Sequence, residues 1–454
     1  MKGKMVQKLL CGVILVTMVS GLAGCGGGKS SADPKPTASS AGAESTQKPK
    51  EQVSLKFFSN SPDRNNGVGK LEDEIAAQYM KENTNVKIEF EALQDEPYKQ
   101  KFKAYTASNE LPDVFMVWGQ SAFFGPVMKG GYAAELNPKD YESYNFVKGT
   151  LDGYSQGGKL YGLPRNLDCM ALFYNKALFE KNGVKVPTTY SELLDAAKAF
   201  RAKGIAPLAI NGKDKWILGI LYQDLVVKYG GDQKLIYNAI EGKTKFATDP
   251  VLLKGAQMMK ELVDAKIFQD SFTSADYGAA NNLFAQEKAA MYYMGSWTMS
   301  MATDVNFSDS FKNNVGVIKF PKMADGKGKD TDILAWCGAG YAVSAKSKQK
   351  AEATKFLNYM FKPENSAKLS WQSGAQVPAQ DYSKFMTGKE SGLQKEITKI
   401  IGEATSTSGV VWYDSATPAF KTDGENLSQE LAAGIKTPEE FLKECDKAVA
   451  NIKN

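Results

Sequence analysis

One stretch of the sequence places polar side chains at the entry of an apolar strand. Residues 169–174, CMALFY, form a nearly continuous apolar run of the kind found in buried strands. Arg165, Asn166 and Asp168 stand at the head of this run. A guanidinium, an amide and a carboxylate can together bind a ligand rich in hydroxyl groups, but the same residues also suit a solvated loop. Which interpretation holds depends on where the fold places the strand.

The composition excludes several kinds of catalytic chemistry. The chain contains no histidine, so Ser-His-Asp triads, Cys-His pairs and the usual zinc sites cannot form. Cys169, Cys337 and Cys445 lack the spacing of metal ligands, and we expect no cofactor and no metal. A calcium ion held by oxygen ligands stays an open alternative. We predict that the three cysteines are small buried apolar residues, with a disulfide between Cys169 and Cys337 as the alternative.

The N-terminus has the pattern of a secretory signal peptide over residues 1–24. A lysine-containing head precedes the apolar stretch 9–23, which is shorter than the roughly 20 residues that a transmembrane helix needs. This stretch ends in LAGC, which resembles the lipobox of bacterial lipoproteins, where the cysteine, here Cys25, receives a diacylglycerol and becomes the new N-terminus. An ordinary signal peptide is the alternative. Residues 25–51 are rich in Gly, Ser, Ala and Pro, which predicts a flexible, lipidated linker.

These features predict a folded body that is anchored by its lipid to the extracytoplasmic face of the cell membrane, as in a Gram-positive bacterium. The chain has 454 residues, which is too long for one hydrophobic core and predicts two lobes. Its formal net charge is +5, and three of its lysines belong to the signal segment. Because no basic run is interleaved with aromatic residues, nucleic acid is not an expected partner.

Strands alternate with helices along the whole sequence, which predicts the α/β class. Residues 53–57 and 86–90 alternate apolar with polar side chains, and residues 70–82 between them have helical spacing. This pattern predicts a parallel β-α-β unit. Ligands of open parallel sheets lie beyond the carboxyl ends of the strands, so we expect the loops 59–67 and 118–125 to face a ligand. Capping boxes, TTYSE and TPEE, predict two further helix starts near residues 190 and 438.

Five segments in order and spacing resemble the bacterial extracellular solute-binding proteins of the maltose-binding type, which deliver solutes to ABC importers. The resemblance covers roughly residues 53–452. The segments are ELPDVFMVWG, KLYGLPRNLDCMALFYNKALFEKNGVKVPTTYSELLDAAKAF, EKAAMYYMGSWTMSMA, GYAVSAKSKQKAEATKFLNYM and LAAGIKTPEEFLKECDKAV. The resemblance implies the type II periplasmic-binding-protein fold, in which two α/β lobes are joined by about three crossing segments and close on a ligand in the cleft.

By this resemblance, lobe 1 comprises residues 52–165 and 320–378, and lobe 2 comprises residues 166–319 and 379–454. The stretch 158–176 becomes the first crossing, so its polar head is expected in the cleft. A sugar needs aromatic rings against its C–H faces and bidentate polar groups at its hydroxyls.

The resemblance places Asp168 where relatives hold a ligand-binding acid, and it matches Trp297 to an aromatic residue that stacks on sugar. The remaining candidates are flanking or cleft-facing polar and aromatic residues, namely Arg165, Asn166, Trp336, Trp412, Asp414, Asp63, Arg64, Asn65 and Trp118. Core packing is the alternative for each tryptophan and a solvated turn is the alternative for residues 63–65. Trp216 and Trp371 are assigned to the core.

The resulting hypothesis is a monomeric, lipid-anchored receptor that binds an oligosaccharide and delivers it to the transmembrane subunits of an ABC permease. The protein is not expected to be an enzyme. One alternative keeps the fold but binds a peptide, a polyamine or an organic anion. A glycoside-acting enzyme that uses Asp168 and Asp414 as its carboxylate pair is another, and a cell-wall adhesin is a third. The identity, linkage and length of the sugar do not follow from the sequence.

Overall fold

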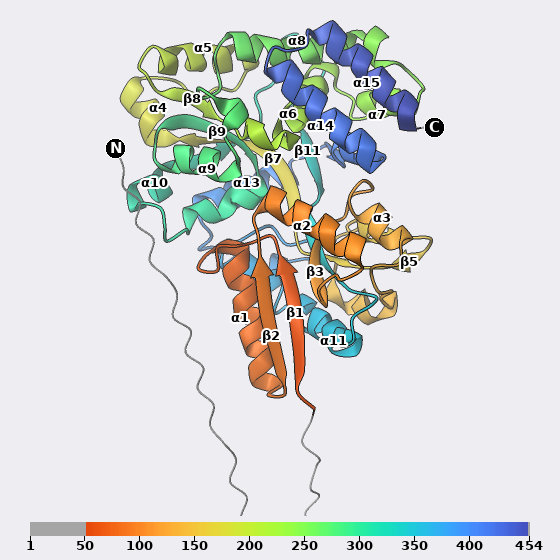
Figure 1. The fold of residues 1–454 in the computed structure, drawn as a ribbon. Helices are drawn as coiled ribbons and strands as arrows, with labels where there is room; N and C mark the ends of the chain where they lie inside the picture. Colours follow the sequence, from red (N-terminus) through yellow and green to blue (C-terminus); the bar gives the residue numbers. More distant parts are fainter. Residues whose placement is uncertain (1–50, 453–454) are drawn as a thin grey trace, which may run out of the picture. The chain divides into compact units, whose positions relative to one another are not determined.

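The computed structural model describes residues 51–452, whose strands form two main sheets and a short two-stranded ribbon. Strands and helices alternate along this part of the chain, so the predicted α/β class is confirmed (Figure 1). The predicted signal peptide, and all of the predicted linker except residue 51, lie outside the described residues.

The first sheet contains the parallel β-α-β unit that the sequence predicts. Its strand order is β2-β1-β3-β12-β6. The strands are β1 (Val53–Ser59), β2 (Val86–Ala92), β3 (Val114–Trp118), β6 (Leu163–Pro164) and β12 (Ala339–Val343). β1 pairs in parallel with β2 and β3, whereas β12 pairs antiparallel with β3 and β6. In β1, the buried Leu55 and Phe57 alternate with exposed residues, as a period of two requires.

The helices on this side are α1 (Gly67–Glu82), α2 (Asp95–Ser108), α3 (Phe124–Lys129), α11 (Lys350–Phe361) and α12 (Ala367–Gln372), with the 3-10 turns η1 (Pro138–Tyr144) and η2 (Asp152–Tyr154). Helices α1, α2, α3 and α11 bury apolar residues in the core of the first sheet, and α12 packs on α1. The ribbon of β4 (Ser155–Gln156) and β5 (Lys159–Leu160) precedes β6. Figure 1 shows α1 beside β1 and β2, with α11 in the same, lower half of the view.

The second sheet is built around β7 (Leu167–Asn175), the apolar run identified in the sequence. Its order is β13-β11-β7-β9-β8, with β10 also paired to β7. These strands are β8 (Ala206–Ala209), β9 (Ala289–Gly295), β10 (Val315–Ile318), β11 (Asp332–Cys337) and β13 (Ser406–Gly409). Every residue of β9 is buried, which fits a central strand covered on both faces.

Helices of the second sheet's side form most of the C-terminal half. The α-helices are α4 (Lys176–Asn182), α5 (Tyr190–Arg201), α6 (Trp216–Gly230), α7 (Leu235–Ile240), α8 (Pro250–Asp264), α9 (Tyr277–Ala285), α10 (Asp309–Asn314), α13 (Gly392–Gly402), α14 (Pro418–Ala432) and α15 (Pro438–Ile452). The 3-10 turns are η3 (Gly212–Asp214), η4 (Phe246–Thr248), η5 (Phe272–Ser274), η6 (Ser296–Ala302), η7 (Ser383–Phe385) and η8 (Trp412–Ser415). In Figure 1, α14 and α15 lie side by side and α15 packs on α8.

Three segments run between the two sheets and hydrogen-bond to one another. The first joins β6 to β7, and the second joins β11 to β12 at Gly338, whose N–H donates to the carbonyl of Asn166 at 2.9 Å. The third segment follows α12 and contains Ala379, whose N–H donates to the carbonyl of Arg165 at 3.2 Å. The predicted lobe boundary at residue 320 is wrong, because β11 belongs to the second sheet and Phe320 packs in the core around it. The chain returns to the first sheet only at Gly338.

The local predictions can be compared with the structure at the cysteines and capping boxes. Cys169, Cys337 and Cys445 are free thiols, so the alternative of a Cys169–Cys337 disulfide is wrong. Cys169 and Cys445 are buried as predicted, whereas Cys337 is half-buried. The capping box at Thr189 begins α5, and Thr437 and Glu440 exchange the same pair of hydrogen bonds at the start of α15.

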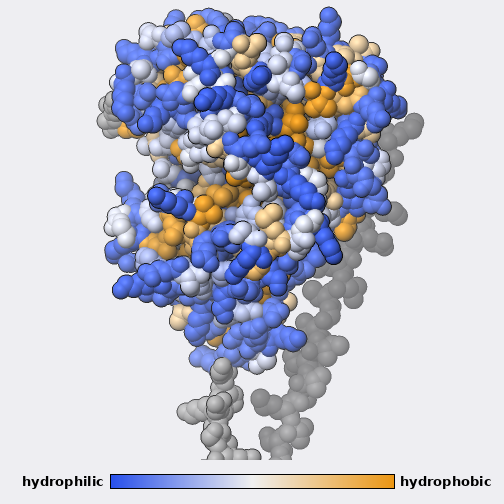
Figure 2. Space-filling model, turned by 180° about the vertical axis from the view of Figure 1, so that it is seen from behind, coloured by the Kyte–Doolittle hydropathy of each residue, from blue (hydrophilic) through white to orange (hydrophobic). Residues whose placement is uncertain are grey.

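The face opposite to that of Figure 1 is covered mostly by hydrophilic residues, with smaller hydrophobic patches between them (Figure 2). Within residues 51–452, no helix combines the length and the apolar character needed to cross a membrane.

Candidate functional site

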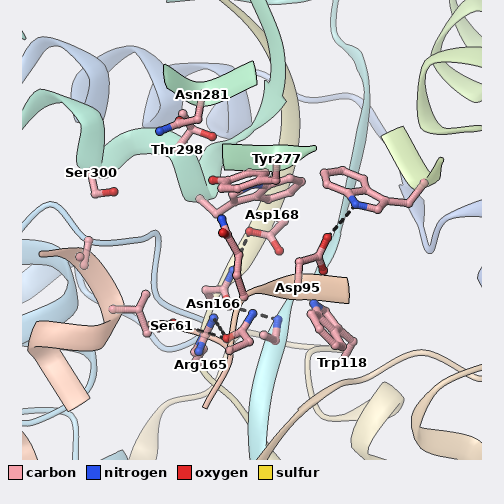
Figure 3. A pocket seen from close by; sticks show the side chains of 18 of the residues that line it. Ser61, Asp95, Trp118, Arg165, Asn166, Asp168, Tyr277, Asn281, Thr298 and Ser300 are labelled. Atoms are coloured by element: carbon pink, nitrogen blue, oxygen red, sulfur yellow. Dashed lines mark hydrogen bonds between the residues drawn. The ribbon is translucent and has the colours of Figure 1, made fainter. Parts of the chain in front are cut away.

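A cavity of about 380 Å³ lies where elements of the two sheets meet. This volume falls within the roughly 300–1,000 Å³ of typical small-molecule sites. On the side of the first sheet, the cavity is lined by the loop after β1, the start of α2 and the end of β3. On the other side it is lined by the first turns of α6 and α9 and by η6 and η8. The crossing segments contribute Arg165, Asn166 and Asp168, which we call the polar floor (Figure 3).

Within the polar floor, Asn166 and Asp168 form a tight pair. The amide N–H of Asn166 donates to Asp168 Oδ1 at 2.6 Å, and its Oδ1 accepts from the N–H of Ala339 at 3.1 Å. Both side chains are buried. Gly338 makes room for them, because a Cβ there would lie 2.2 Å from Asp168 Oδ2 and 2.5 Å from Asn166 Nδ2. Burial raises the pKa of Asp168 to about 7, and the charge of Arg165 and the hydrogen bond from Asn166 only partly offset this effect.

Arg165 is held from below by a buried carboxylate that the sequence analysis did not identify. Its Nη1 donates to the hydroxyl of Tyr341 at 2.9 Å, and that hydroxyl donates to Glu72 Oε1 at 2.6 Å. The guanidinium of Arg165 also lies 3.8 Å from Glu72, whose other oxygen pairs with Arg64 at 2.6 Å. Glu72 is therefore compensated by two guanidinium groups. Arg165 lines the cavity, but its strongest contacts fix the crossing strand to α1.

Three tryptophans form one wall of the cavity, which we call the aromatic wall: Trp216, Trp297 and Trp336. The ring centroid of Trp297 lies 6.0 Å from that of Trp216 and 6.3 Å from that of Trp336. Trp336 is the register partner of Asp168 across the β11–β7 pair, so the two side chains share a face of the sheet. Trp216, assigned to the core from the sequence, packs against the core and also lines the cavity.

The start of η6 is shaped to hold Trp297. A Cβ on Gly295 would lie 2.0 Å from Cζ3 of the indole, so only glycine fits at this position. The polar residues that follow in the same turn, Thr298 and Ser300, also line the cavity, as does Asn281 of α9 (Figure 3). None of these three residues is among those predicted from the sequence, although Thr298 and Ser300 stand beside Trp297 in the motif GSWTMS.

The candidates from the first sheet divide into two groups. Trp118 lines the cavity at the end of β3, with the ring of Phe123 5.0 Å away and Lys99 Nζ 5.4 Å from its ring centroid. Asp63 also lines the cavity, and it accepts a hydrogen bond from Asn306 Nδ2 at 3.1 Å. Arg64 and Asn65 do not line it. Arg64 instead pairs with Glu72 and lies over the ring of Phe90, and Asn65 is exposed.

In the C-terminal segment, the aromatic residue that lines the cavity is Tyr413 and not the predicted Trp412. Trp412 is fully buried in the core, where its indole N–H donates to the carbonyl of Gly219 at 3.0 Å, so its prediction as a ligand contact is wrong. Tyr413 lines the cavity instead. Asp414 lines it as well, and its carboxylate pairs with Lys421 at 2.8 Å. Burial raises the pKa of Asp414 although Lys421 opposes the effect.

Each cation that lines the cavity in the described part of the chain has a carboxylate partner. Lys99 pairs with Asp95 at 3.1 Å and Lys421 with Asp414 at 2.8 Å. Arg165 is compensated by Glu72. Among residues 51–452, no cluster of three or more His, Cys, Asp or Glu side chains could hold a metal ion. The site therefore offers aromatic faces, amides and a carboxyl group of near-neutral pKa, and such groups suit a ligand with apolar faces and many hydroxyls.

Comparisons with known proteins agree with this architecture. Residues 65–367 match the model of the family "Bacterial extracellular solute-binding protein". The multiple sugar-binding protein of Streptococcus mutans is 26% identical over 328 residues, which are 70% of this chain and 73% of that protein. A solved structure from work on xylan utilization by the thermophilic bacterium Caldanaerobius polysaccharolyticus is 30% identical, with a TM-score of 0.79 over 87% of this chain and 99% of the other.

A solved chitin oligosaccharide binding protein is 26% identical, with a TM-score of 0.78 over 88% of this chain and 99% of that protein. The family match covers more than half of the chain, and the two solved structures extend the likeness to both sheets. The chain therefore belongs to the family of bacterial extracellular solute-binding proteins.

Proposed function

We propose that this protein is the solute receptor of an ABC sugar importer and that it binds an oligosaccharide in the cavity between its two sheets. The observation that carries the proposal is the aromatic wall facing the polar floor. Trp297 and Trp336 offer ring faces to the C–H groups of a pyranose, while Asp168 and Asn166 offer an acceptor and a donor to its hydroxyls. The sugar-binding relatives support the same solute class.

The pairing of charges argues against an organic anion as the solute. An organic anion needs an uncompensated cation, whereas Lys99, Arg165 and Lys421 each have a carboxylate partner. For a polyamine, Asp168 is a poor partner because burial raises its pKa to about 7, but Asp63 and Asp304 also line the cavity, so polyamines stay in the screen below. A peptide is a further alternative that the experiment below must separate from a sugar.

We propose a binding role without catalysis. A glycoside-acting enzyme would need two carboxyl groups in separate acid and nucleophile or base roles. Of the candidate pair, Asp414 is buried and ion-paired with Lys421, and such pairing holds its carboxylate in place rather than leaving it to attack or protonate a substrate. Incubation with oligosaccharides should therefore produce no new reducing ends.

We also propose that lobe 1 comprises residues 52–165 and 338–378 and lobe 2 residues 166–337 and 379–452, with hinge motion at the three crossing segments. Closure of these lobes on the sugar would present the monomer to the transmembrane subunits of the permease. The lipobox-like LAGC supports attachment of a lipid to Cys25 at the extracytoplasmic face of the membrane. Metabolic labelling with a palmitate analogue should label the native chain and leave Cys25→Ala unlabelled.

A thermal-shift screen of purified protein tests the solute class. The screen compares neutral oligosaccharides with peptides, polyamines and organic anions at equal concentrations. A bound solute at about 100 times its dissociation constant should add about 2.7 kcal/mol of stability. Stabilisation by peptides but by no oligosaccharide would refute the sugar proposal.

Trp297→Ala then tests the site. Truncation of a central stacking residue should cost about 2 kcal/mol or more of binding free energy, which is roughly 30-fold in affinity. Trp297→Phe keeps a ring face and should lose less. Unchanged affinity in Trp297→Ala, with an unchanged melting temperature of the free protein, would remove Trp297 from the site.

A further inference from the structure

One hydrogen bond connects the aromatic wall to the opposite side of the cavity. The indole N–H of Trp216, the first residue of α6, donates to Asp95 Oδ2 at 2.8 Å (Figure 3). Asp95 is the first residue of α2, which packs on the first sheet. The two residues are 121 positions apart in the sequence and approach the cavity from different sheets.

Asp95 is well placed to hold this indole but not to bind a ligand itself. Its Oδ1 lies 3.1 Å from Lys99 Nζ while its Oδ2 accepts from Trp216, so each oxygen is engaged by a protein group. Its position in the first turn of α2 also stabilises the carboxylate through the helix dipole. A charged acceptor makes the hydrogen bond to the indole stronger than a neutral one would.

The bond to Asp95 fixes the indole of Trp216, whereas the backbone at the start of α6 is held by Tyr413, whose hydroxyl donates to the carbonyl of Trp216 at 2.8 Å. The preceding residue, Lys215, has a φ of 65° and no side-chain hydrogen bond to the helix start. A positive φ is unfavourable for lysine. The ring of Trp216 is half-buried and touches Trp297, so a rotation of the indole would change the surface that the aromatic wall presents.

We propose that Asp95 is a positioning residue for ligand binding: it orients Trp216 and, through it, the aromatic wall. The inference rests on the proposed function for the identity of the ligand but not for the contact itself. Since Asp95 and Trp216 belong to different lobes, the bond also joins the two lobes across the cavity. Its loss should therefore speed ligand dissociation more than it slows association.

Four variants test the proposal: Asp95→Ala, Asp95→Asn, Trp216→Phe and the double variant Asp95→Ala/Trp216→Phe. Glu96→Ala is the matched control, since Glu96 stands in the same helical turn and pairs with Lys99 at 2.6 Å but does not line the cavity. Affinity and dissociation rate are measured with whichever solute stabilises the protein in the thermal-shift screen. The Nε1–H resonance of Trp216 in ¹H–¹⁵N spectra of the ligand-free protein reports the contact directly.

Loss of a hydrogen bond to a charged acceptor should weaken binding about tenfold or more in Asp95→Ala and in Trp216→Phe. Asp95→Asn keeps an acceptor oxygen and should stay within about threefold of the parent protein. The double variant should bind no more weakly than the weaker single variant, because both remove the same contact. Asp95→Ala should shift the Trp216 resonance, and Glu96→Ala should change neither the resonance nor the affinity.

Three results would overturn the inference: an unshifted Trp216 resonance in Asp95→Ala, equal effects of Asp95→Ala and Glu96→Ala, or losses that multiply in the double variant. Asp95→Asn keeps the volume of its side chain and Trp216→Phe keeps an aromatic ring, so they carry the test if Asp95→Ala folds poorly. Failure of every oligosaccharide to bind, with the resonance shift present, would instead refute the proposed solute class and leave the positioning role to be measured with the solute that does bind.

Discussion

Replacement of the buried carboxyl of the polar floor should change how stability depends on pH. The pKa of Asp168 rises from 3.8 to about 7 on folding, chiefly because of burial. Between these two values the folded protein holds a proton that the unfolded chain has released. The free energy of unfolding must therefore fall as the pH rises from about 4 to about 7. Above about pH 7 the folded protein has released this proton as well, so the stabilisation from its binding is lost in full and no longer changes with pH.

The size of the effect follows from the shift. About three pKa units at 1.36 kcal/mol per unit give about 4 kcal/mol over the whole range, and about 3 kcal/mol of it falls between pH 5 and pH 8. Asp168→Asn removes the titration while keeping the shape, since its amide oxygen can still accept from Asn166 Nδ2. At pH 5 the variant should already be more stable than the parent protein by about 1 kcal/mol, and at pH 8 by about 4 kcal/mol.

Urea unfolding of the ligand-free proteins at pH 5, 6, 7 and 8 measures the difference. Burial also raises the pKa values of Asp214 and Asp224 to about 6, but these groups are present in both proteins and cancel in the comparison. The unfolding slope m should be the same in both, which shows that the same surface becomes exposed. Parallel stability curves, with a difference that changes by less than about 1 kcal/mol between pH 5 and pH 8, would refute the reasoning.

Three other substitutions test single features of the fold and the site. Gly338→Ala should impair ligand binding strongly and the stability of the free protein less, because its Cβ would displace Asp168 and Asn166. Calorimetric titration measures the binding and thermal melting measures the stability. Unimpaired binding would contradict the close approach of Gly338 to these two side chains. Lys228→Ala should cost about 3–5 kcal/mol of unfolding free energy, since the buried ammonium donates to the carbonyl of Asp332 at 2.6 Å; a loss below about 1 kcal/mol in urea unfolding would count against this role. Thr189→Ala should cost only about 1 kcal/mol of unfolding free energy through the lost cap of α5, and an unchanged stability in urea unfolding would contradict this.

Local patterns in the sequence determined the elements of this protein well. Alternating residues in 53–57 and 86–90, with a helical stretch between them, are sufficient for a parallel β-α-β unit, because periodicity and connection length act over short distances. The capping box at Thr189 specifies the start of α5 for the same reason. The resemblance to solute-binding proteins, rather than a local pattern, implies that the polar head of the run 169–174 faces the cleft, and Arg165, Asn166 and Asp168 line the cavity.

Other features of the site depend on contacts between distant residues. In a 3-10 turn, successive side chains point about 120° apart. Trp412 and Tyr413 of η8 therefore point in different directions: both are buried in the core, but Tyr413 also lines the cavity. In the sequence, Glu72 is one of several polar residues of α1. Its pairing with Arg64 and Arg165 is visible only in the structure. Pairings between such distant residues cannot be inferred from a single sequence.

Trp216 and the second crossing show the same limit. The side chain of Trp216 is apolar enough for a core, and only its partner Asp95, brought from the other sheet, holds it at the cavity. The chain returns to the first sheet at Gly338 rather than near residue 320 because β11 first pairs with β7, a choice set by strand register. The sequence alone thus determined the strands, helices and chemical types at this site, whereas tertiary pairing decided which side chains meet there.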